Sequence, residues 1–214
     1  MDVQDRARRH AALGDPIRLA LVDDLAASDR SPTELGRRHE LPSNLLAHHL
    51  DVLEEAGLVE RTDSTGDRRR RYVRLRRAAV LDLGMGVTSP EGPVLFVCTH
   101  NSARSQLAAA LWRREVGSEA DSAGTHPADR VHPGAIAAAR RAGLDLSDAR
   151  PKTIDEAGLR NRRVITVCDR AHEELEPDGD RLHWSTPDPA DDPAPDAFDA
   201  ALGRLRARIV TMQG

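Results

Sequence analysis

Hydrophobic residues in the first part of the chain recur with the period of an α-helix. One stripe follows Asp15 and Pro16, a pair typical of a helix start, and a second stripe ends at Gly57. The members of the stripes are Ile17, Leu21 and Leu25, and then Leu46, Leu50 and Leu53. This spacing predicts two amphipathic helices that share a core.

Further signals complete the first domain. Ser31, with Glu34 three residues later, predicts a capped short helix between the two stripes. After Gly57, residues 58–61 and 71–75 read as strands on either side of a charged tip at residues 64–67. The predicted order is therefore three helices and a β-hairpin.

The second part of the chain alternates short apolar runs with helical stretches. Residues 94–97 and 164–167 read as buried strands, and the helices are expected at residues 105–116, 133–142 and 196–212. Such alternation predicts an α/β domain with a parallel sheet. A stretch rich in glycine and proline separates the two patterns. We therefore expect a first domain at residues 1–84, a linker at 85–92 and a second domain at 93–214.

Composition narrows the class of protein. The 214 residues are 39% hydrophobic and 31% charged, which suits two folded domains, and the aromatic share of 2% predicts an aliphatic core. No apolar run approaches the ~20 residues of a membrane helix, so a soluble cytoplasmic protein is expected. Two cysteines do not make a disulfide scaffold, which leaves each thiol free for chemistry.

The helices and the hairpin of the first domain suit DNA binding. In a helix-turn-helix the second helix enters the major groove, and outward side chains near its start meet the bases. Here these are Ser43, Asn44, Ala47 and His48. The hairpin carries Arg68, Arg69, Arg70 and Arg71, which would lie along the phosphates as a wing. By pattern alone, a solvated interaction module is an equal alternative.

Residues 12–19 and 45–59 strongly resemble the winged-helix repressors of the ArsR family, over about residues 5–80. The resemblance implies a homodimer on operator DNA, joined through the segments at residues 3–12 and 78–83. It departs from the metalloid-sensing branch, because residues 31–38 hold no cysteine. The histidines have no clear metal-ligand spacing, and we expect no metal site among His10, His39, His48 and His49; His49 reads as a structural residue.

The second domain carries a cysteine in a strand-to-helix loop. The loop is Cys98, Thr99, His100, Asn101, Ser102, Ala103, Arg104 and Ser105. Backbone N–H groups and the helix dipole favour an anion at such a place, and the arginine can grip two oxygens of a tetrahedral oxyanion. The same field stabilises a thiolate at Cys98. Ser105 is expected to donate to the sulfur and Asn101 to hold the loop in shape.

From about residue 93 to residue 212 the chain resembles the low-molecular-weight protein tyrosine phosphatases and the arsenate reductases that share their fold. The motifs are the loop, residues 122–125, residues 132–133 and residues 184–190. The resemblance implies a four-stranded parallel sheet, Cys98 as nucleophile, Arg104 as oxyanion clamp and Asp188 as general acid.

Two features favour the reductase over the phosphatase. Ala190 and Asp191 stand where the phosphatases usually place aromatic residues. Cys168 matches the resolving cysteine of the thioredoxin-coupled reductases, which takes the oxidised product as a disulfide. Their third cysteine is replaced by Leu175, and Ala109 stands where a glutamate associated with a potassium site is expected.

The sequence therefore predicts an arsenic-responsive transcriptional regulator fused to a thiol-dependent arsenate reductase without a tightly bound cofactor. Two recycling routes stay open: a thioredoxin-like protein reduces a disulfide between Cys98 and Cys168, or a small thiol such as mycothiol or glutathione attacks the Cys98 adduct and Cys168 is structural. Two other functions also stay open. The second domain is then a non-catalytic sensor of arsenate or phosphate, or a phosphatase for phosphoesters.

Overall fold

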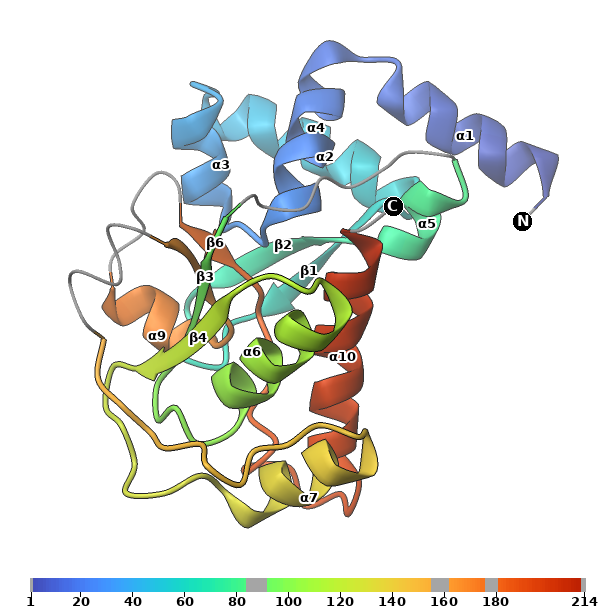
Figure 1. The fold of residues 1–214 in the computed structure, drawn as a ribbon. Coiled ribbons are helices and arrows are strands. Elements are labelled where there is room, and N and C mark those ends of the chain that lie inside the picture. The colour runs from blue at the N-terminus through green and yellow to red at the C-terminus, as the bar shows by residue number, and fades with distance from the viewer. Residues whose placement is uncertain (1, 84–91, 155–161, 176–180, 213–214) are drawn as a thin grey trace. The chain divides into compact units, whose positions relative to one another are not determined.

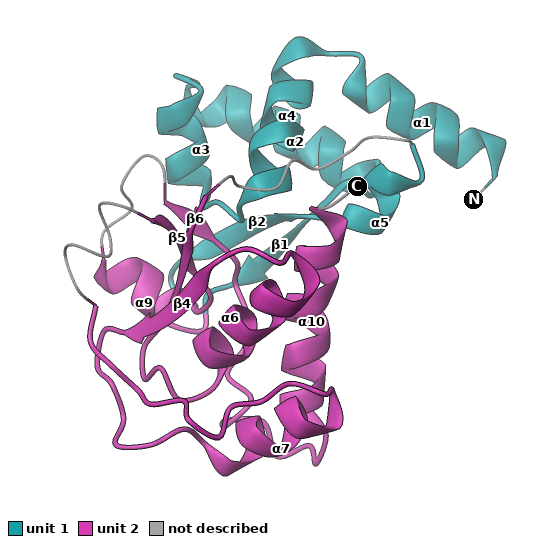
Figure 2. Cartoon of the chain, in the orientation of Figure 1, with its two compact units in different colours: residues 1–64, 68–88, 214 teal, residues 65–67, 89–213 magenta. Residues whose placement is uncertain are grey.

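The computed structural model describes residues 2–83, 92–154, 162–175 and 181–212 (Figure 1). The chain divides into two compact units, residues 1–64 with 68–88 and 214, and residues 65–67 with 89–213 (Figure 2). The predicted linker lies outside the described residues except for Gly92. None of the helices that the structure describes is long and apolar enough to cross a membrane.

The first unit is helical with one hairpin. Its elements are α1 (Val3–Leu13), α2 (Pro16–Ala27), α3 (Pro32–Arg38), α4 (Ser43–Glu55), β1 (Val59–Asp63), β2 (Arg71–Leu75) and α5 (Arg77–Leu81). Side-chain caps start the helices as predicted: Asp15 accepts from the Arg18 N–H, and Ser31 and Glu34 form a capping box. β1 and β2 pair antiparallel from Val59 opposite Leu75 to Asp63 opposite Arg71.

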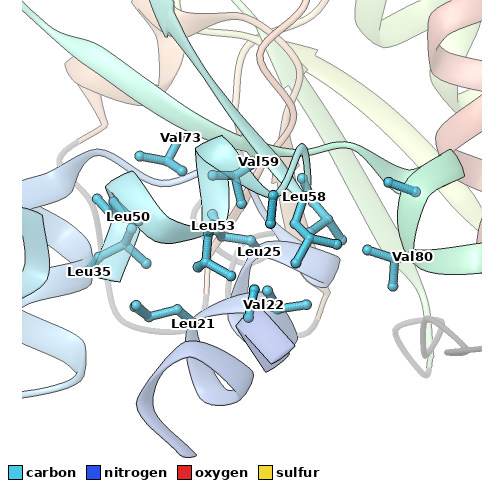
Figure 3. Packing of buried hydrophobic residues seen from close by; sticks show 14 of the residues in the cluster. Leu21, Val22, Leu25, Leu35, Leu50, Leu53, Leu58, Val59, Val73 and Val80 are labelled. Carbon is cyan, nitrogen blue, oxygen red and sulfur yellow. The ribbon is translucent and has the colours of Figure 1, made fainter. Parts of the chain in front are cut away.

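The predicted stripes form the core of this unit. Leu21, Leu25 and Leu53 are fully buried, and Leu50 is nearly so, where α2 and α4 face each other below the hairpin (Figure 3). β-branched Val59 and Val73 complete the core from the hairpin. Burial of one such side chain stabilises the fold by about 1.5 to 3 kcal/mol. The cluster is aliphatic, as the composition predicts.

The second unit is an α/β fold. Its elements are β3 (Val94–Cys98), α6 (Arg104–Glu115), β4 (Ala120–Gly124), α7 (Pro133–Arg141), β5 (Arg163–Thr166), α9 (Asp169–Glu174), β6 (Leu182–His183) and α10 (Ala197–Thr211). The four strands are parallel in the order β4-β3-β5-β6. α6 packs on β3, β4 and α10, whereas α9 packs on β3 and β5. This confirms the predicted fold class.

Three aromatic residues lie at the centre of the second unit. Phe96 on β3 is fully buried, with ring centroids 5.7 Å from Trp112 and 5.6 Å from Trp184. Aromatic pairs at this separation contribute about 0.5 to 1.5 kcal/mol beyond their buried area. The expectation of an aliphatic core therefore holds for the hydrophobic cluster of the first unit and is wrong for the second unit.

Candidate active site

The loop between β3 and α6 has its outward carbonyl groups bound by the segment that follows β4. Four backbone N–H groups of that segment each donate to a carbonyl of the loop. The pairs are Thr125 to Cys98 at 3.2 Å, His126 to Thr99 at 2.8 Å, Ala128 to His100 at 3.0 Å and His132 to Ser102 at 2.8 Å. A loop whose carbonyls are occupied this way leaves its amide groups for an anion. These four hydrogen bonds support the prediction that the loop binds an oxyanion, and the sequence did not indicate them.

The Cys98 sulfur faces two hydrogen-bond donors. The Asn101 backbone N–H donates to Sγ at 3.2 Å, and the Ser105 hydroxyl oxygen lies 3.0 Å from Sγ. Asn101 Nδ2 donates to that hydroxyl oxygen at 2.8 Å, which leaves the hydroxyl proton to point at the sulfur. With the Ser105 hydroxyl proton directed this way, the sulfur accepts two hydrogen bonds.

Asn101 is the centre of the loop. It is fully buried and adopts φ of 48°, the left-handed region that asparagine tolerates better than most residues. Its side-chain oxygen accepts from the Lys152 backbone N–H at 2.9 Å and from Gln106 Nε2 at 3.2 Å. Gly124 lets the loop pass this close, because a Cβ there would lie 2.7 Å from the Thr99 carbonyl oxygen.

Arg104 is buried at the first position of α6 and is bound on both arms of its guanidinium. Nη1 donates to the Thr186 carbonyl at 2.9 Å, and Nη2 forms an ion pair with the Asp188 carboxylate. The Asp188 side chain is 25% exposed, whereas that of Arg104 is 7% exposed. The predicted clamp and the predicted acid are therefore in direct contact.

A cavity of about 40 Å³ opens above the sulfur. Its lining combines the predicted nucleophile, clamp and acid with five other residues: Cys98, His100, Ser102, Ala103, Arg104, His132, Asp188 and Ala190. By the measure in which one water needs about 10 to 15 Å³, this volume suits an ion of a few heavy atoms. Of the two residues that stand where the phosphatases usually place aromatic residues, Ala190 lines the cavity and Asp191 does not.

Cys168 lies two residues beyond the end of the neighbouring strand β5 and is the N-cap residue of α9. Thr166 on β5 pairs with Val97 on β3, so Cys168 follows the sheet at the same edge as Cys98. Its sulfur lies 3.3 Å from the Thr99 hydroxyl and accepts from the Ala171 N–H at 3.4 Å. Burial raises the pKa of the Cys168 thiol; the charge of Arg104 acts in the opposite direction, and that of Cys98 raises the pKa further. Both cysteines are free and buried.

A buried polar cluster beside Cys168 was not foreseen from the sequence. Asp169 accepts from His183 Nε2 at 3.1 Å, and the His183 ring stacks on His172 with centroids 4.1 Å apart. Burial by itself would raise the pKa of Asp169, but the hydrogen bond and charge of His183 hold it well below its usual range. The cluster fixes the start of α9 at the residue after the second cysteine.

The residues predicted to meet DNA all lie on the surface of the first unit. The side chains on α4 and on the hairpin are exposed: Ser43, Asn44, Ala47, His48, Arg68, Arg69, Arg70 and Arg71. Leu45 on α4 is also 38% exposed, which the helical pattern did not single out.

Two histidines of the first unit are placed by carboxylates. His49 is buried with Nδ1 3.8 Å from Asp15, and His39 Nε2 lies 3.3 Å from Asp24. Asp24 also accepts from Arg30 and Arg38. Within the described parts of the chain, His, Cys, Asp and Glu form no group of three or more that could hold a metal ion.

Both parts of the chain match models of known protein families. Residues 93–199 match the low molecular weight phosphotyrosine protein phosphatase family, and residues 13–62 match a helix-turn-helix domain. The chain belongs to the low molecular weight phosphotyrosine protein phosphatase family, with a helix-turn-helix domain before the phosphatase-like domain.

Several named proteins are similar to the second unit. An arsenate reductase of Halalkalibacterium halodurans is 36% identical over 45% of this chain and 73% of its own length. An arsenate reductase of Brevibacillus brevis is 33% identical over 54% of this chain and 90% of its own length. The structure of the tyrosine phosphatase Wzb from Escherichia coli K30 in complex with sulphate matches with a TM-score of 0.50 and 25% identity, over 55% of this chain and 93% of that one.

Proposed function

We propose that the second domain reduces arsenate to arsenite with thiols and that the first domain is an ArsR-type regulator of operator DNA. The observation that carries the enzymatic half is the Cys98 sulfur, which accepts from Asn101 and faces Ser105 beneath an ion-sized cavity with Arg104 in its wall. The similarity to two arsenate reductases supports arsenate as the oxyanion.

Binding is the first step. The loop amides and the Arg104 guanidinium receive the oxygens of the tetrahedral anion. Because Asp188 holds Nη2 of Arg104 in the free protein, the anion has to displace this carboxylate. The displaced Asp188 then lies beside the bound anion, where a carboxyl group retains a proton more readily.

Chemistry follows at the sulfur. The Cys98 thiolate forms a bond to arsenic while one arsenic–oxygen bond breaks, and Asp188 gives a proton to the oxygen that leaves as water. A second thiolate then attacks Cys98 Sγ. The electron pair of the sulfur–arsenic bond stays with arsenic, which leaves as arsenite, and the two sulfurs become a disulfide.

Cys168 is our first choice for the second thiol. It lies two residues beyond the end of β5, the strand next to that of Cys98, and the charge of the Cys98 sulfur raises the pKa of the Cys168 thiol. A thioredoxin-like protein would then reduce the disulfide. In the alternative route, mycothiol or glutathione attacks the Cys98 adduct, and Cys168 serves only to start α9, where its sulfur accepts from the Ala171 N–H.

The first domain supports the regulatory half. The side chains at the start of α4 are exposed for base contacts, and the four arginines of the hairpin are exposed for phosphate contacts. Val3 on α1 is 73% exposed and Leu81 on α5 is 43% exposed, which suits the homodimer implied by the resemblance. A regulator of an operon works beside the chromosome, so we expect the protein in the cytoplasm.

The test is arsenite production by the full chain with a thioredoxin system, glutathione or mycothiol in turn. We expect activity in the wild type and its loss in Cys98→Ser. Loss in Cys168→Ser with every donor supports Cys168 as the resolving thiol, whereas full activity with a small thiol removes that role.

Two outcomes would overturn the assignment as an arsenate reductase in favour of another function. A protein that binds arsenate or phosphate and makes no arsenite with any donor is an oxyanion sensor. Faster hydrolysis of an aryl phosphate than reduction of arsenate, lost in Cys98→Ser, identifies a phosphatase.

A further inference from the structure

We propose that His132 is a substrate-binding residue, which donates a hydrogen bond from Nε2 to an outer oxygen of the bound oxyanion. The inference rests on the proposed function in that it takes the ligand to be a tetrahedral oxyanion. The carrying observation is that His132 lines the same small cavity as Cys98, Arg104 and Asp188.

The backbone places His132 at the loop. Its N–H donates to the Ser102 carbonyl at 2.8 Å, the last of the four bonds that hold the loop carbonyls away from the cavity. His132 is also the N-cap residue of α7. The imidazole is therefore positioned by the same contacts that shape the oxyanion loop.

The hydrogen bonds of the ring define its tautomer. Nδ1 accepts from the Gly134 backbone N–H at 3.0 Å, so in the neutral ring the proton is on Nε2. Nε2 makes no hydrogen bond to any residue within 2–83, 92–154, 162–175 or 181–212. Nε2 is thus a donor that the described part of the fold does not use, on a residue that lines the cavity.

The ring is also held in place. It stacks on Phe198 of α10 with centroids 4.6 Å apart and an interplanar angle of 15°. Gly134 makes room for this stack, because a Cβ there would lie 2.5 Å from the Phe198 ring. A donor that is already fixed loses little conformational entropy when it binds an anion.

The chemistry fits a tetrahedral anion. Arg104 and the loop amides hold the oxygens that face the protein, and an N–H donor on the wall suits an oxygen that faces outward. Because Nδ1 accepts from the Gly134 N–H, the ring of His132 donates only from Nε2. It therefore contributes to anion affinity, and we assign it no proton transfer.

Two substitutions separate this role from helix capping. In His132→Asn the side-chain oxygen takes the place of Nδ1 and keeps the Gly134 bond, but the donor at Nε2 is lost. In His132→Gln the amide nitrogen takes the place of Nε2, but the cap is lost. The probe is inorganic phosphate, titrated calorimetrically into the full chain, and thermal unfolding confirms that each variant is folded.

We expect His132→Asn to weaken phosphate binding about tenfold, as for a lost hydrogen bond to a charged group, and His132→Gln to stay within about threefold of the wild type. His126→Gln, at an exposed histidine that does not line the cavity, should leave the affinity unchanged. Wild-type affinity in His132→Asn overturns the inference, and so do equal losses in both variants or a wild type that binds no phosphate.

The arsenite assay distinguishes this inference from the proposed function. If the wild type binds phosphate with the expected order of variants but makes no arsenite, the reductase is wrong and the role of His132 stands. If the wild type makes arsenite and His132→Asn keeps both its phosphate affinity and its KM for arsenate, only the role of His132 is wrong.

Discussion

The guanidinium of Arg104 is ion-paired with the carboxylate of Asp188, so in the free protein the residue that would grip an oxyanion is already bound by an internal anion. The arginine side chain is 7% exposed and the aspartate side chain 25%. Removing one member of such a pair leaves the other without its counter-charge. We therefore expect that removing the Asp188 carboxylate has opposite effects on the affinity for an oxyanion and on the rate of turnover.

Asp188→Asn should bind phosphate more tightly than the wild type and reduce arsenate more slowly. The substitution removes the carboxylate that competes for Arg104 and repels the anion, so we expect an affinity gain of about tenfold. The same substitution removes the proposed proton donor, so kcat should fall by about 10² or more. Phosphate calorimetry and steady-state arsenite production give the two numbers.

A nearby exposed carboxylate provides the control. Asp191→Asn removes the same charge three residues further on, at a position that does not line the cavity. It should change neither the phosphate affinity nor kcat by more than about twofold. If Asp188→Asn weakens phosphate binding, the carboxylate does not compete with the ligand.

Asn101→Asp should slow the reaction of Cys98 with iodoacetamide by about tenfold at pH 7. The carboxylate keeps the shape of the amide and still accepts from Lys152 and Gln106, but it no longer donates to Ser105. The Ser105 proton then turns to residue 101 and leaves the sulfur, which loses one donor worth about 1.5 kcal/mol. Alkylation is followed by mass spectrometry in a Cys168→Ser background.

Ser105→Ala tests the same chain of hydrogen bonds from its other end. It removes the hydroxyl that lies 3.0 Å from the sulfur without adding a charge, so alkylation should slow by a similar factor. Alkylation of Ser105→Ala at the wild-type rate would contradict the hydroxyl's role.

The pH dependence of arsenite release should report the ionisation of Cys168. Burial raises the pKa of this thiol above its usual value of about 8.5, so at neutral pH only a small fraction is thiolate. If Cys168 attacks the Cys98 adduct, single-turnover release should accelerate about tenfold per pH unit from pH 7 upward until the raised pKa is reached. Rapid-quench measurement of arsenite checks this, and a flat profile between pH 7 and 9 excludes Cys168 as the attacking thiol.

Local patterns determined the predicted elements because their causes are local. The stripe of Leu46, Leu50 and Leu53 faces the core, and the Ser31 cap starts α3, since periodicity and capping act within a few residues. The predicted ends of the helices in the second unit differ from the observed ends by at most one residue. For example, α6 starts at Arg104 and not at residue 105. The strand β4 was not predicted, because its small residues lack the apolar run that marks a buried strand.

The contacts within the candidate site were harder to predict. The motifs located Cys98, Arg104 and Asp188, but the ion pair between the last two joins residues 84 positions apart. The tautomer of His132 and its stack on Phe198 likewise depend on how α7 and α10 pack. Neither spacing nor composition encodes such contacts, because they follow from the tertiary arrangement of the domain.

Glu40→Gly should stabilise the first domain by about 1 kcal/mol. Glu40 lies between α3 and α4 with φ of 52°, a left-handed conformation that costs a residue with a Cβ about 1 to 2 kcal/mol and glycine little. The same exchange at Glu55, the exposed last residue of α4, should instead destabilise by about 0.5 kcal/mol because its backbone is helical. Urea unfolding measures both, and equal signs for the two variants would contradict the strain at residue 40.

The hairpin and α4 should affect DNA binding differently. Arg69 and Arg70 are exposed on the hairpin, and if they contact phosphates, replacing both with alanine should weaken binding to every sequence. The slope of log K against log salt should then fall by about one unit per lost contact. Replacing Asn44 or His48 should relax the preference for the operator and leave that slope almost unchanged, because base contacts release few counterions. Fluorescence anisotropy at several salt concentrations, on operator and random duplexes, separates the two effects. An unchanged slope in the double arginine variant would show that the hairpin does not lie along the phosphates.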